Sequence, residues 1–246
     1  HNPKASCVGE ILSAGEFYDY DAKYNNAESR TVIDPELPEG KMDEIRQILQ
    51  GENIQFVSLK DENLQDVEII ENGSTFEENA IIKARTISDL TGQMVLADDS
   101  GLEVDYLNKE PGIYSARYMG EDTSYHIKNA NLIERLEGED TSYDIKNNHI
   151  IDLLAGVPDD QRTARFVCVI ACAFPDGRTI TVRGVIEGRI GYEQKGENGF
   201  GYDPIFYVPE FGCTTAELSS EDKNKVSHRG KALTAMYEEL KRENCL

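Results

Sequence analysis

The feature that most constrains the fold is a pair of β-rich segments separated by a tight-turn signal. Residues 164–174 and 179–190 are rich in apolar and β-branched side chains, and Pro175-Asp176-Gly177 lies between them. Such a turn between two strand-forming segments predicts an antiparallel hairpin. Strand-forming and helix-forming segments mix along the chain without strict alternation. We therefore expect an α/β class with a mixed, partly antiparallel sheet.

A capped helix and a buried strand are expected before this hairpin. Thr75-x-x-Glu78 fits a capping box, and apolar residues continue at helical spacing as far as Gly92. The apolar run at 94–97 then predicts a short central strand. Further patterns predict short strands at 31–33 and 54–59 and helices at 42–49, 216–224 and 231–242.

The strand at 94–97 runs into Asp98-Asp99-Ser100-Gly101, which we interpret as a turn. Ionised carboxylates at the end of a buried strand are unfavourable without a cation. Because Mg²⁺ prefers carboxylate oxygens, this turn is a candidate for a metal ligand and a general base. A solvated turn is the alternative.

The overall charge restricts the possible partners. The chain has 46 Asp and Glu residues against 25 Lys and Arg, a formal net charge of −21. A surface of this sign repels phosphates and anionic lipids, so we expect neither a nucleic acid nor a membrane partner. If the ligand is a polyanion, a divalent cation and a few placed basic residues must compensate locally.

The cysteines and the absence of long apolar runs bear on the compartment. No run in this sequence approaches the roughly 18 residues of a membrane helix, and no secretory leader pattern opens it. We therefore expect a cytoplasmic protein. Its cysteines are odd in number and lack zinc spacing, so we expect small, buried, reduced thiols; they are Cys7, Cys168, Cys172, Cys213 and Cys245.

Two further motifs carry side chains suited to a nucleotide. Gly199-Phe200-Gly201-Tyr202-Asp203-Pro204 sets aromatic residues among glycines, so Phe200 is either a stacking face for a base or a plug of the core. Lys223 and Ser227-His228-Arg229-Gly230 form a basic cluster. Its hydrogen-bond donors suit phosphate oxygens or the carbonyl of a base. The alternative is a helix end, where basic residues interact favourably with the helix dipole.

An internal repeat interrupts the chain. Gly120-Glu121-Asp122-Thr123-Ser124-Tyr125 recurs from Gly138, and Ile127-Lys128-Asn129 recurs as Ile145-Lys146-Asn147, so the period is 138 − 120 = 18 residues. Eighteen residues make five helical turns, so an inserted copy could double a helix and keep its buried face. We interpret the repeat as an insertion without chemistry.

Taken in order, the motifs resemble those of one family, the non-standard purine nucleoside triphosphate (ITP/XTP, RdgB-like) pyrophosphatases. The resemblance covers about residues 41–243 and is carried by residues 75–80, 97–105, 111–118, 199–206 and 227–230. It implies a homodimer with a two-lobed α/β fold and a cleft between the lobes. The implied activity is Mg²⁺-dependent hydrolysis of ITP, dITP and XTP to the monophosphate and pyrophosphate.

The resemblance also implies roles for individual residues. Asp99 is similar to the family's general base and metal ligand. The second metal ligand is expected at Glu71, with Glu68 as the alternative. The implied substrate contacts are Lys41, Ser100, Phe200, Gly201, Tyr202, Asp203, Lys223, His228 and Arg229.

The N-terminal part departs from the family pattern. Family members begin with an apolar strand and a Thr-x-Asn-x-x-Lys phosphate loop, where this chain has Glu36, Pro38 and Lys41. Pro38 has no N–H to donate, and Glu36 adds negative charge, so the family's first strand and its loop are expected to be missing. Residues 9–36 instead resemble a fragment of a D-alanine–D-alanine ligase.

We therefore expect a foreign segment at 1–40 and a pyrophosphatase domain at 41–246, with the insertion at about 120–155. A catalytically impaired, nucleotide-binding remnant of the family is the alternative function.

Overall fold

The computed structural model describes residues 11–14, 29–32, 54–57, 59, 62–64, 66–119, 142–243 and 245. The chain divides into two compact units. Unit 1 comprises residues 1–100, 168–184 and 228–246, and unit 2 comprises residues 101–167 and 185–227. The expected helix at 42–49, Lys41, Cys7 and the first copy of the repeat lie outside the described residues.

The strands form a mixed sheet in the order β2-β3-β1-β4-β5-β6-β7-β8. They are β1 (Ile11–Ala14), β2 (Ser29–Val32), β3 (Ile54–Val57), β4 (Met94–Val104), β5 (Thr163–Ala173), β6 (Thr179–Ile190), β7 (Phe206–Val208) and β8 (Cys213–Thr214). The β2–β3 pair is parallel, whereas β1–β4, β6–β7 and β7–β8 are antiparallel. The predicted α/β class with a mixed sheet is confirmed.

The predicted hairpin is present between β5 and β6. Gly177 has φ 92°, a left-handed conformation that glycine adopts without steric strain. Its N–H donates to Phe174 O at 3.0 Å, and the Phe174 N–H donates to Arg178 O at 2.9 Å. These two bonds close the turn and join the strands.

Helix α3 (Phe76–Thr91) begins and ends where the sequence predicts. The Glu78 N–H donates to Thr75 Oγ1 at 3.1 Å, and Gly92 ends the helix with φ 67°. The Glu78 carboxylate accepts from the Ser74 N–H at 2.6 Å and from the Ser74 hydroxyl at 2.7 Å. The helix start is therefore fixed by both Ser74 and Thr75.

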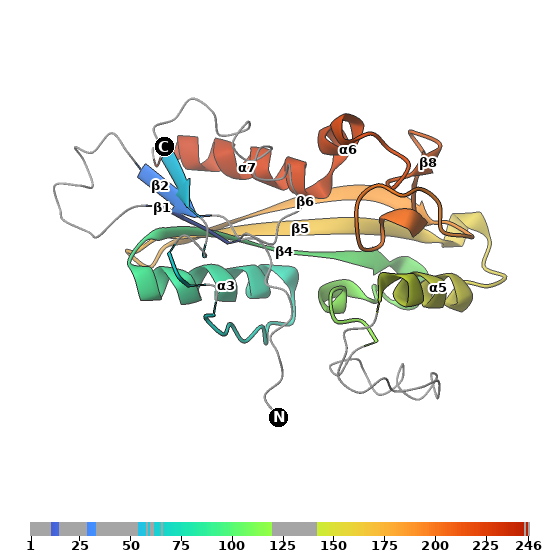
Figure 1. Cartoon of the computed structure of the whole chain (residues 1–246), viewed down its shortest axis with the longest axis horizontal. Coiled ribbons are helices and arrows are strands. Elements are labelled where there is room, and N and C mark those ends of the chain that lie inside the picture. Colours follow the sequence, from blue (N-terminus) through green and yellow to red (C-terminus); the bar gives the residue numbers. More distant parts are fainter. Residues whose placement is uncertain are drawn as a thin grey trace. The chain divides into compact units, whose positions relative to one another are not determined.

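Helix α7 (His228–Arg242) covers one face of the sheet in unit 1, and α3 lies on the other (Figure 1). At Gly184 of β6 an added Cβ would lie 2.0 Å from His228 O, so the start of α7 requires a glycine beneath it. The core under α7 comprises Leu96, Cys168, Ile170, Cys172, Phe174, Ala232, Leu233, Met236 and Leu240. Cys168 and Cys172 are free and buried on this face, as predicted, whereas Cys213 and Cys245 are free but only partly buried.

The last helices start at other residues than predicted. Helix α6 spans Ser220–Val226 instead of 216–224, because Ser219 caps it by accepting from the Asp222 N–H at 3.1 Å. Helix α7 already starts at His228, so the basic motif at 227–230 is the junction of two helices and not a longer loop. None of the helices in the described ranges is long and apolar enough to cross a membrane.

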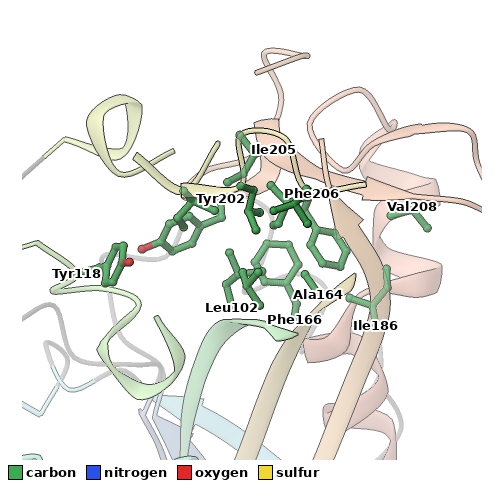
Figure 2. Packing of buried hydrophobic residues seen from close by; sticks show 14 residues of the cluster. Leu102, Tyr118, Ala164, Phe166, Ile186, Tyr202, Ile205, Phe206 and Val208 are labelled. Carbon is green, nitrogen blue, oxygen red and sulfur yellow. The ribbon is translucent and has the colours of Figure 1, made fainter. Parts of the chain in front are cut away.

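Unit 2 has its own core, shown in Figure 2. The rings of Phe166 and Phe206 lie 4.3 Å apart, and Tyr202 reaches across the core to donate its hydroxyl to Ser115 O at 2.7 Å. Helix α5 (Tyr143–Leu153), formed by the second copy of the repeat, adds Ile150 to this core. Short 3₁₀ turns lie at Asp105–Leu107, Gly112–Tyr114, Asp159–Gln161 and Asp203–Ile205.

Candidate active site

The residues expected to bind metal and nucleotide fall into two groups, one in each unit. In unit 1 they are Glu71, Asp99, Ser100, His228 and Arg229, and in unit 2 they are Phe200, Gly201, Tyr202, Asp203 and Lys223. Lys41 lies outside the described residues. Each group is held by residues of its own unit.

The interpretation of Asp98-Asp99-Ser100-Gly101 as a turn is wrong. Strand β4 has 11 residues and continues through these four, and Asp98 and Asp99 are only 3% and 7% exposed. The strand can continue because each carboxylate has a cationic partner, Arg229 for Asp98 and the buried Lys83 for Asp99. Successive side chains of a strand point to opposite faces, so the two neighbours meet different helices.

Asp98 faces α7. Its Oδ2 accepts from Arg229 Nη2 at 3.2 Å and from Ser100 Oγ at 2.7 Å, with Cys168 Sγ at 3.7 Å. Burial opposes the charge, but Arg229 and then Lys83 outweigh it, so the pKa of Asp98 lies below its ordinary value. Asp98 thus anchors two of the expected substrate contacts, Ser100 and Arg229.

Asp99 faces α3, on the other side of the sheet. Lys83 Nζ donates to Asp99 Oδ1 at 2.9 Å and lies 3.4 Å from Glu71 Oε2. Asn79 Nδ2 donates to Asp99 Oδ2 at 3.4 Å. Burial raises the pKa of Asp99 to about 6, although Lys83 opposes the rise. Burial also works against a charged Lys83, but Asp99 and Glu71 outweigh it and raise the lysine pKa.

Lys83 and Asn79 are site residues that the sequence analysis missed. A signal existed, because both lie on the helix face that also carries Phe76, Ala80 and Ala84, and both are buried with them. A lysine in an apolar stripe needs a partner or a function. Gly73 supports this group: its N–H donates to Asn79 Oδ1 at 2.9 Å, and an added Cβ would lie 2.6 Å from that oxygen.

The two carboxylates near Lys83 are suitable ligands for a magnesium ion. Glu71 and Asp99 both lie within 4 Å of the same Nζ, which brings two carboxylates together. Magnesium is commonly held by one or two carboxylates together with water and substrate phosphates. Among the described residues no set of three or more His, Cys, Asp or Glu could hold a metal, so a closed cage is not the arrangement here. Glu68 is exposed, which favours Glu71.

In unit 2, Asp203 organises the glycine-rich loop. Its Oδ2 accepts from the Phe200 N–H at 2.9 Å and from Lys223 Nζ at 2.5 Å, and its Oδ1 accepts from Thr215 Oγ1 at 2.8 Å. Gly199 has φ 82°, and an added Cβ would lie 2.2 Å from Asp203 Oδ2. A glycine is therefore needed for Asp203 and Lys223 to meet.

The two aromatic residues of this loop have different surroundings. Phe200 is 50% exposed, and Lys223 Nζ lies 5.7 Å from its ring centroid. Tyr202 is 4% exposed and belongs to the core. The core alternative therefore applies to Tyr202, and stacking of a base on Phe200 stays a prediction.

Comparison with known proteins gives consistent matches. The Ham1 family model matches residues 38–146 and 135–239; the two ranges overlap inside the repeat, as expected for a duplicated segment. A dITP/XTP pyrophosphatase of Desulforamulus reducens is 48% identical over 82% of this chain and 92% of its own length. One of Bacillus licheniformis is 46% identical over 83% and 94%. The structure of the Staphylococcus aureus Ham1 protein is 38% identical, with a TM-score of 0.69 over 84% of this chain and 95% of its own.

Proposed function

The chain belongs to the Ham1 family, and on this premise we propose that it hydrolyses dITP, ITP and XTP to the monophosphate and pyrophosphate. The relatives that are 48% and 46% identical are dITP/XTP pyrophosphatases, which supports this substrate class. The observation that carries the proposal is the buried group of Glu71, Lys83 and Asp99, which joins two carboxylates and a lysine in the way a triphosphate site requires.

The proposed chemistry at the unit 1 group is attack by water. Asp99 accepts the proton as the water oxygen bonds to phosphorus, and the bond from phosphorus to the pyrophosphate oxygen breaks. The Lys83 ammonium stabilises charge on the phosphate oxygens. Magnesium, held by Glu71 and Asp99, would supply further charge neutralisation.

The proposed recognition of the base uses the unit 2 group. Phe200 offers an exposed ring for stacking, and Lys223 offers a donor to the 6-oxo group of hypoxanthine or xanthine. Adenine has a 6-amino donor at that position, so it would leave the lysine unpaired. Guanine also has a 6-oxo group, and its rejection must depend on the 2-position.

The test is the rate of pyrophosphate release from ITP, dITP, XTP, ATP and GTP with Mg²⁺. We expect a preference of at least 10²-fold for the first three substrates over ATP. Replacing Lys223 with Met should reduce this preference more than it reduces kcat. Equal rates with ITP and ATP in the native protein would refute the proposal.

A second candidate, a nucleotide-binding remnant with little turnover, is favoured by the N-terminal sequence. The family match starts at residue 38, and Glu36 and Pro38 stand where the family's phosphate loop is expected. Replacing residues 36–41 with a Thr-x-Asn-x-x-Lys segment should then raise kcat by about 10² to 10³. An unchanged kcat would count against this candidate.

We also propose a cytoplasmic homodimer that uses Mg²⁺. The support is the family resemblance together with the buried, reduced Cys168 and Cys172. Sedimentation of the purified protein tests the dimer, and replacing Mg²⁺ with a chelator tests the metal. A monomer at micromolar concentration, or full activity with the chelator, would contradict the respective point.

A further inference from the structure

Helix α5 supports the loop that carries Phe200. Asn147 of this helix is 1% exposed, and its Nδ2 donates to Gly201 O and to Gln194 Oε1, both at 3.1 Å. Gly201 directly follows Phe200 and has φ 66°. Gly201 lies in a turn, outside the described helices and strands, so its carbonyl is not held by a helix or a sheet. The bond from Asn147 orients this carbonyl instead.

One turn earlier, Tyr143 supports the same loop. Its ring lies edge-on to the ring of Tyr202, with centroids 5.3 Å apart and planes at 89°. An added Cβ at Gly201 would lie 3.5 Å from the Tyr143 ring, which is van der Waals distance. Tyr143 and Asn147 are four residues apart and lie on one face of α5. This face contacts Gly201 and Tyr202, the two residues that follow Phe200.

The Asn147 amide is held at a thermodynamic disadvantage. Its Oδ1 is buried and has no hydrogen-bond partner among the residues that the structure describes. A buried unpaired acceptor costs about 1–3 kcal/mol. Turning the amide over would not help, because its oxygen would then face two acceptors, Gly201 O and Gln194 Oε1. An apolar residue would avoid this cost but could not hold the Gly201 carbonyl, so the two donated bonds account for an asparagine here.

We propose that Asn147 is a positioning residue for base binding: by fixing the Gly201 carbonyl, it sets the conformation in which Phe200 presents its ring. This inference rests on the proposed function, and it assigns a task to the repeat. The first copy has Asn129 at the corresponding position, since 147 − 129 = 18. Sequence alone treats the two asparagines alike, whereas the contacts of α5 assign the task to the second copy.

The test compares Asn147→Ala with Asn129→Ala in the full chain. We expect Asn147→Ala to raise KM for ITP and XTP about ten-fold with kcat within two-fold, and to reduce the preference for ITP over ATP. Asn129→Ala should leave both constants unchanged. A purely structural role would lower the melting temperature without changing the ITP/ATP ratio.

Asn147→Asp covers the case in which the alanine variant does not fold. The aspartate keeps the shape but loses both donated hydrogens, so KM for ITP should rise here as well. A native-like KM in either folded variant, or an equal rise in Asn129→Ala, overturns the proposal. Failure of the proposed function is distinguishable, because the native protein would then show no preference for ITP or XTP.

Discussion

The middle of β4 and the residue directly after its end hold aspartates in opposite situations. Asp99 is buried, has one close cation in Lys83, and its pKa is raised to about 6 by burial. Asp105 is more exposed and accepts two bonds from Arg165, both at 3.0 Å, as well as bonds from Thr163 and Lys109. These bonds hold the pKa of Asp105 well below its usual range.

The ionised carboxylate of Asp105 stabilises the fold, whereas burial disfavours the ionised carboxylate of Asp99. The hydrogen bonds of Asp105, above all those from Arg165, outweigh the effect of its burial, so its contribution to folding is sufficient reason for its presence. Asp99 is desolvated and lies near a second carboxylate, Glu71, which also raises its pKa. Groups held in such an unfavourable state are typical of functional sites.

Asp99→Asn should reduce pyrophosphate release from ITP by 10³-fold or more, because it removes the proposed base and one metal ligand together. The fold should remain, since the amide has the same size and Lys83 keeps Glu71 as a partner. Steady-state kinetics measure the effect, with Asp105→Asn as the matched control. If kcat of Asp99→Asn stayed within ten-fold of the native value, Asp99 would not be the catalytic base.

Lys83→Met should lower kcat by about 10² to 10³ and the free energy of unfolding by about 3–5 kcal/mol. The reason is that Asp99 and Glu71 would then lie together without a buried cation. Millimolar Mg²⁺ should therefore raise the melting temperature of this variant more than that of the native protein. Equal shifts would mean that the two carboxylates do not share a cation.

Asp98→Asn should lower the free energy of unfolding by about 2–4 kcal/mol, because Arg229 would lose its buried charged partner. Its effect on kcat should be smaller than that of Asp99→Asn, since Asp98 acts through Ser100 and Arg229. Urea unfolding and kinetics on the same sample provide the comparison. If Asp98→Asn and Asp99→Asn lose equal activity, the two faces of β4 have similar roles.

Asp105→Asn should destabilise the protein slightly at pH 7 and less at pH 3. The folded pKa of Asp105 is lowered, so its contribution is present above the unfolded value near 4 and is lost as pH falls toward the folded value. Urea midpoints of both proteins at the two pH values measure this. A difference that grows in acid would contradict the assignment, and unchanged activity at pH 7 is expected.

The local features of the fold could be predicted from sequence, and the long-range ones could not. The hairpin at Gly177 and the caps of α3 follow from neighbouring residues, and both predictions are confirmed. The continuation of β4 through Asp98 and Asp99 depends on Arg229 and Lys83, which are 131 and 16 residues away. The residues next to the two aspartates do not indicate these partners, and two adjacent aspartates followed by a glycine are typical of a turn.

The candidate site follows the same division. Motifs indicate the residue types around Asp99 and Asp203, whereas Lys83 is indicated only by its place in the apolar stripe of a helix. The separate surroundings of Phe200 and Tyr202, one exposed and one in the core, depend on Ser115 and Lys223, which are distant in sequence. The repeat is a further case, because two similar copies have the same propensities and only tertiary contacts distinguish them.

The opposite placement of Asp98 and Asp99 also fixes the register of β4. A slip of one residue in one direction would bring Ala97 to Arg229, and a slip in the other would bring Ser100 to Lys83. Either slip would place an uncharged residue of β4 opposite one of the two cations and exchange the apolar side chains between the two faces. Asp98 and Asp99 therefore also help to set the register of β4, because only one register pairs Asp98 with Arg229 and Asp99 with Lys83.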